Sequence, residues 1–60
     1  MPGLLTAMSD TQPEVRRRAA WALGVIGDGR ATPVLTMALH DQDRDVRRHA
    51  AWALGHVGGR

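Results

Sequence analysis

The sequence repeats itself after 31 positions, and this period constrains its fold more than any other feature. The hexapeptide Ala-Ala-Trp-Ala-Leu-Gly at residues 19–24 recurs at residues 50–55, and about half of the aligned positions are identical. A fixed period of this length is typical of stacked supersecondary units, each of which buries its apolar face only against a neighbour. We therefore expect residues 1–60 to form a single domain of two repeats.

The amino-acid composition and the positions of proline and glycine predict helices. The chain has no Phe, Tyr, Cys or Lys, and Ala, Leu, Val, Met and two Trp carry most of its apolar content, which favours helices over strands. Pro13 suits a first helical position, and Gly24 to Gly27 permit a left-handed cap, so one helix should span this segment. A second should run from about Arg44, behind Asp43 as N-cap, to about Val57.

Two shorter helices should precede these long ones. One is expected at residues 2–8 and the other at residues 31–40, after a turn at Asp28-Gly29 and with Pro33 in its first turn. If the short helices are named B and the long ones A, the order is B-A-B-A. The predicted fold class is all-α, an α-solenoid of helical hairpins.

The helical period also predicts which residues are buried. One stripe of the first long helix should pack on the B helices; it comprises Val15, Ala19, Ala22, Leu23 and Ile26, facing Leu4, Leu5, Met8, Val34, Leu35, Ala38 and Leu39. One flank of this stripe is small (Ala20, Gly24, Gly27) and the other is bulky (Arg18, Trp21, Val25). Small against bulky suggests how repeats seat on one another, with Trp21 or Trp52 buried between them.

The repeated pattern resembles the HEAT repeat, in particular the short unit of phycobilisome-lyase-type proteins and of artificial repeat proteins derived from them. The motif is Asp10-x-x-Pro-Glu-Val-Arg-Arg-x-Ala-Ala-Trp-Ala-Leu-Gly-x-Ile-Gly-Asp28, repeated from Asp41 to Gly58. The resemblance implies a scaffold fold. It also implies a ladder between repeats, formed by Asp10 with Arg16 and Asp41 with Arg47.

No group of reactive side chains converges in the sequence. The histidines are His40, His49 and His56, and the last two lie roughly 10 Å apart along one helix, too far to share an ion without a third ligand. Without cysteine there are no disulfides or thiolate metal sites. We expect no catalytic site, metal or cofactor; a fragment of a lyase-like or metal-dependent enzyme is a third hypothesis.

Charge leaves a second hypothesis open. Eight Arg against six acidic residues give a net charge of +2, and the arginines at 16–18 and 47–48 could follow a phosphate backbone. Glu14, Asp43 and Asp45 lie in the same helical turns, so a solvated surface is the simpler reading. No apolar run approaches the roughly 20 residues needed to span a bilayer, and the first residues lack a signal-peptide pattern, so a soluble, cytoplasmic chain is expected.

The leading functional hypothesis is a protein-interaction or self-assembly module. Two periods would be 62 residues and the chain has 60, so its ends are in register and each should expose apolar surface. The expected contact residues are Leu5, Met8, Trp21, His49, Trp52 and His56. A homodimer is favoured because closed two-fold symmetry is commonest, with a ring or filament as the alternative. A natural, designed or fragmentary origin fits the sequence equally well.

Overall fold

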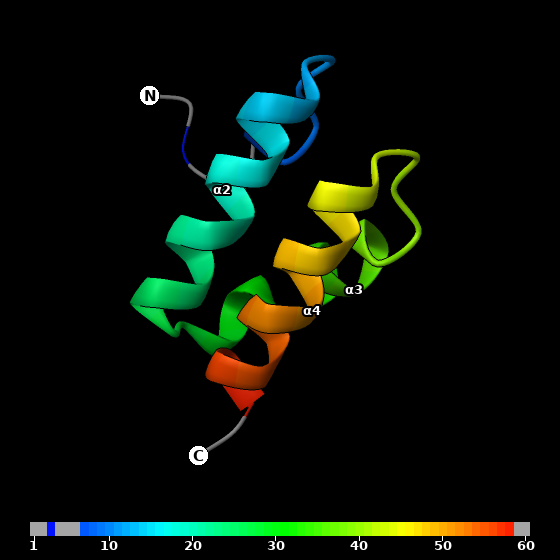
Figure 1. Cartoon of the computed structure of the whole chain (residues 1–60). Helices are drawn as coiled ribbons and strands as arrows, with labels where there is room; N and C mark the ends of the chain where they lie inside the picture. The colour runs from blue at the N-terminus through cyan, green and yellow to red at the C-terminus, as the bar shows by residue number, and fades with distance from the viewer. Residues whose placement is uncertain (1–2, 4–6, 59–60) are drawn as a thin grey trace.

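A computed structural model describes residue 3 and residues 7–58 of the chain (Figure 1). Its elements are α2 (Pro13–Ile26), the 3-10 turn η1 (Gly29–Ala31), α3 (Thr32–Ala38) and α4 (Arg44–Gly58). No strand occurs in this part of the chain, which confirms the all-α prediction. The helix expected at residues 2–8 lies mostly outside the described residues. None of the described helices is long and apolar enough to cross a membrane.

Local signals set the ends of α2. Pro13 occupies the start of the helix, where its missing N–H costs nothing. Gly27 ends it with φ 71°, a left-handed conformation that glycine adopts without strain. The Gly27 N–H donates to the Leu23 carbonyl at 3.0 Å, which satisfies one of the last free carbonyls of the helix.

Asp43 caps α4, as expected from the sequence. Its Oδ1 accepts hydrogen bonds from the N–H groups of Asp45 at 2.9 Å and Val46 at 3.1 Å. Gln12 occupies the equivalent place before α2 and makes no such bond with its side chain. The two long helices therefore begin at equivalent positions, but only α4 has a side-chain cap.

The second short helix is shorter than predicted. The expected helix at residues 31–40 is replaced by η1 followed by α3, which ends at Ala38. Leu39 donates to the Thr36 carbonyl at 3.2 Å and His40 donates to the Met37 carbonyl at 3.0 Å. Both bonds span three residues, so the chain tightens into a 3-10 turn and leaves the helix axis before Asp41.

The helices α2 and α4 lie side by side and run in the same direction (Figure 1). Helix α4 also packs against α3. Small residues dominate the core, so the helices can approach closely. The buried apolar residues are Met8, Ala19, Ala20, Leu23, Ala31, Leu35, Ala38, Val46, Ala50, Ala53 and Val57.

This packing corrects the predicted core stripe of α2. Val15 is 37% exposed and Ile26 is 60% exposed, whereas Ala20 and Gly24, assigned to a flank, are buried. The prediction assumed that α2 packs mainly on the short helices. Among the described elements, α2 packs against α4 of the following repeat, and this contact buries the small flank.

Candidate functional site

The contact between the two repeats centres on a glycine. A Cβ atom built on Gly24 would lie 2.6 Å from Cζ3 of Trp52 and 2.9 Å from Cα of Ala53. Neither distance is compatible with a side chain, so α4 reaches α2 only because residue 24 is glycine. The small flank of the first repeat thus receives the bulky flank of the second.

An arginine–aspartate pair joins the same two repeats near the start of the helices. Nε of Arg16 donates to Oδ2 of Asp41 at 2.7 Å, and Nη2 donates to Oδ1 at 3.0 Å. The hydrogen bond from Arg16 is the main reason that the pKa of Asp41 lies below its usual value. This bidentate geometry fixes both direction and distance between the repeats.

Arg16 and its counterpart Arg47 each also donate to a backbone carbonyl within their own repeat. Nη1 of Arg16 donates to the Asp10 carbonyl at 2.7 Å, and Nη1 of Arg47 donates to the Asp41 carbonyl at 2.6 Å. The family resemblance implied a ladder between neighbouring repeats, with Asp10 matched to Arg16 and Asp41 to Arg47. The link between carboxylate and guanidinium crosses from the first repeat to the second, a pairing of residues 25 apart that a six-residue motif does not reveal.

Equivalent residues of the two repeats differ in exposure in a systematic way. Val15 is 37% exposed and its counterpart Val46 is 0% exposed. Ile26 is 60% exposed and its counterpart Val57 is 8% exposed. Because the residue types are alike, the difference reflects the elements that pack against α4, namely α2, α3 and η1.

The open side of the first repeat forms an apolar hollow of about 480 Å³, which we call the head face. It is lined by Ala7, Val15, Arg18, Ala19, Trp21 and Ala22. Trp21, which is 54% exposed, lines both this hollow and the groove described below. An exposed indole beside a hollow lined mainly by Ala and Val can anchor another apolar surface.

The opposite side of α4 exposes its small residues, which we call the tail face. It comprises Ala51, Leu54 and Gly55, of which Ala51 and Gly55 are exposed and Leu54 is partly buried. A Cβ on Gly55 would meet no atom within 4 Å. Its counterpart Gly24 is covered by Trp52. The same Ala-Gly surface is therefore occupied by an indole in the first repeat and exposed in the second.

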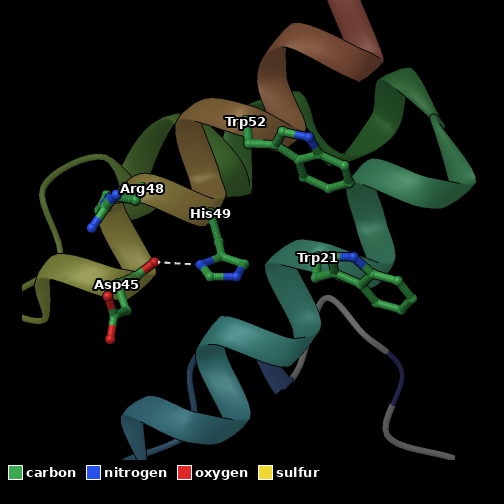
Figure 2. Close-up of a pocket in the computed structure, with 5 residues that line it drawn as sticks. All are labelled: Trp21, Asp45, Arg48, His49 and Trp52. Atoms are coloured by element: carbon green, nitrogen blue, oxygen red, sulfur yellow. Dashed lines mark hydrogen bonds between the residues drawn. The ribbon is translucent and has the colours of Figure 1, made fainter.

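A groove of about 550 Å³ follows the outer surface between α2 and α4 (Figure 2). It is lined by Trp21, Asp45, Arg48, His49 and Trp52. Figure 2 shows both indoles extending to the same side, with the His49 ring turned toward α2 and Arg48 directed away from the indoles. Nδ1 of His49 lies 2.7 Å from the Asp45 carbonyl.

Neither tryptophan is buried, contrary to the expectation for at least one of them. Trp52 packs on Gly24 through one edge of its ring but remains 38% exposed. Its other neighbour is His56, whose ring centroid lies 4.1 Å from that of Trp52 and whose Nδ1 lies 3.0 Å from the Trp52 carbonyl. Because the indole ring is large, one edge of Trp52 contacts α2 while the rest of the side chain lines the outer groove.

The remaining residues expected at an interface lie elsewhere. Leu5 is outside the described residues. Met8 is buried, so it contributes to the core rather than to an exposed surface. Across residues 7–58, no three His, Asp or Glu side chains gather closely enough to hold a metal ion.

Comparison with known proteins agrees with this architecture. A search of curated proteins gives no match. The family model for HEAT repeats matches residues 1–60, the whole sequence. HEAT repeats generally serve as scaffolds for protein interactions and are typically non-catalytic. This match over the whole sequence shows that the chain belongs to the HEAT repeat family.

Proposed function

We propose that this chain is a non-catalytic scaffold module that binds proteins, and that other copies of itself are among its partners. The observation that carries this proposal is the head face. An apolar hollow with a half-exposed tryptophan is a surface on which a partner gains free energy by displacing water. Tryptophan is also the residue type most enriched at the energetic centres of interfaces.

The charged side chains beside this surface support protein binding over nucleic-acid binding. Arg16 is held by Asp41, and Arg17 lies 3.6 Å from the carboxylate of Asp45. Both arginines are therefore partly neutralised by neighbouring carboxylates. A phosphate backbone would have to compete with these pairs, which weakens the case for the alternative function.

The resemblance to phycobilisome-lyase-type repeats rests on the sequence pattern alone. Four of the aspartates of the described residues are engaged in structural hydrogen bonds, which gives no support to a lyase activity. Asp10, Asp28, Asp41 and Asp43 all accept hydrogen bonds from nearby backbone N–H groups.

The mass in solution tests the proposed self-association. Light scattering over a hundredfold range of concentration should show a mass that rises above that of one chain. Trp21→Glu should lower the association constant by at least tenfold, since it places a charge in an apolar contact. Met37→Glu is the matched control, because Met37 is also exposed but lies on α3, away from the head face.

Two results would contradict the proposal. A wild-type mass of one chain at every concentration would exclude self-association. Salt-sensitive binding of random-sequence DNA in a gel-shift titration, together with a constant mass of one chain, would favour the nucleic-acid alternative.

A further inference from the structure

We propose that copies of this chain associate head to tail, with Trp21 of one copy packed over Ala51 and Gly55 of the next. The inference rests on the proposed self-association and specifies its contact. In the structure, the bulky side of the second repeat already packs on the small side of the first. The intermolecular contact repeats this internal one.

The head face is equivalent in sequence to the surface of the second repeat at the internal contact. Each residue that lines the hollow has a counterpart 31 residues later, in the second repeat. Those counterparts are Ala38, Val46, His49, Ala50, Trp52 and Ala53. Four of them are buried, namely Ala38, Val46, Ala50 and Ala53, and Trp52 packs on Gly24. The hollow is therefore the surface that the second repeat presents to α2, left open in the first.

The tail face has the residues that such a surface needs. Ala51 and Gly55 correspond to Ala20 and Gly24, which receive the second repeat. The residue types are identical in the two pairs. Since Gly24 tolerates no side chain beneath Trp52, an open glycine at the equivalent position provides the space that a second indole requires.

Asp10 and Arg47 are held in the same way as Asp41 and Arg16, which form an ion pair with each other. Oδ1 of Asp10 accepts from the Gln12 N–H at 2.8 Å, as Oδ1 of Asp41 accepts from the Asp43 N–H at 2.9 Å. Arg47 is held by a backbone carbonyl in the same way as Arg16. Arg47 of the copy that supplies the tail face and Asp10 of the copy that supplies the head face can therefore form the bidentate pair that Arg16 and Asp41 form internally.

Charge also favours this direction over a contact between two head faces. A symmetric contact between two head faces would leave Arg47 outside the interface, so Asp10 would not gain the arginine partner that Asp41 has in Arg16. The head-to-tail contact brings Asp10 to Arg47 instead. Such a contact is heterologous, so repeating it produces a ring or a filament rather than the closed dimer favoured from sequence.

The deciding experiment blocks one face at a time. Trp21→Glu blocks the head, and Gly55→Glu blocks the tail without crowding its own chain, because the Gly55 Cβ position is open. Circular dichroism checks that both variants, and the Met37→Glu control, keep the helical signal of the wild type. The masses of each variant alone and of an equimolar mixture are then measured by analytical ultracentrifugation.

The head-to-tail contact predicts monomers for each blocked variant alone and a one-to-one dimer in the mixture. The intact head of the Gly55→Glu chain pairs with the intact tail of the Trp21→Glu chain, and no further chain can add. A Gly55→Glu variant that still dimerises alone would overturn the inference in favour of a symmetric head contact. A Trp21→Glu variant that still dimerises alone would overturn it in favour of a tail contact.

The inference and the proposed self-association fail in distinguishable ways. Wild-type chains that associate while both blocked variants behave like the wild type would overturn the head-to-tail contact alone. Wild-type chains that stay monomeric at every concentration would overturn both.

Discussion

Gly24 on α2 packs against one edge of the indole ring of Trp52 on α4, and a Cβ atom at Gly24 would lie 2.6 Å from Cζ3 of that ring. The equivalent glycine of the second repeat, Gly55, has open space around it. The same sequence pattern thus occurs once in a packed environment and once in an exposed one. Equal substitutions at the two positions can therefore be compared within one chain.

Replacing the two glycines with alanine should have opposite effects on stability. Gly24→Ala introduces a methyl group against Trp52 and Ala53, and such overpacking costs about 1 to 3 kcal/mol. Gly55→Ala should stabilise the chain by up to about 1 kcal/mol, since alanine favours a helix interior over glycine. Urea denaturation at a concentration where the chain is monomeric measures both. A loss of stability in both variants would contradict the open environment of Gly55.

The two equivalent leucines should differ as well. Leu23 is buried, so Leu23→Ala should lower the free energy of unfolding by about 2 to 5 kcal/mol. Leu54 is only partly buried, so Leu54→Ala should cost distinctly less. Thermal melting of dilute samples provides the comparison. Equal losses would show that α4 is covered on its tail face even in the monomer.

Helix capping predicts a further pair of effects. Asp43→Ala removes the acceptor for the N–H groups of Asp45 and Val46 and should cost about 0.5 to 2 kcal/mol. Gln12→Asp supplies α2 with the cap that its counterpart has and should raise stability by about 1 kcal/mol. Chemical denaturation monitored by circular dichroism tests both changes. An unchanged midpoint for Gln12→Asp would mean that the start of α2 does not limit stability.

Acid should weaken the fold through two aspartates whose pKa is depressed. The side chain and N–H of Arg30 lower the pKa of Asp28 from 3.8 to about 2, and Arg16 lowers that of Asp41 from 3.8. A group with a lower pKa in the folded state contributes stability that is complete above its unfolded value of 3.8. That contribution is lost as the pH falls from there toward the folded pKa.

The melting temperature should therefore fall below about pH 4, and Asp41→Asn should flatten this fall because it removes one of the titrating groups. Asp28→Asn should also flatten the fall, because Asp28 is the other aspartate whose pKa is depressed. If the curve of Asp41→Asn keeps the full slope of the wild type, the pair with Arg16 does not contribute to acid sensitivity.

The sequence predicted the long helices and the place where each begins, because these depend on nearby residues. Pro13, the cap at Asp43 and the left-handed Gly27 act within one helical turn of their positions. The end of α3 was harder to predict. The 3-10 bonds of Leu39 and His40 reflect the direction that the chain takes toward the next repeat.

The buried face of each long helix could not be predicted from a single repeat. Val15 and Val46 occupy the same position in the pattern, yet only Val46 is fully buried. Periodicity identifies an apolar stripe but not the helix that covers it. The resemblance placed Arg16 and Asp41 in a ladder between repeats, but the six-residue motif did not assign them to each other, because stacking of the repeats brings them together.

The contact between α2 and α4 is pinned near both ends. Arg16 holds Asp41 close to the start of α2, and Gly24 receives Trp52 close to its end. Separating the helices at one end would break the contact at that end, so neither end can act as a hinge. The two helices should consequently move together as one rigid unit. Flexing of a longer stack would then occur by small, evenly shared rotations rather than at one weak joint.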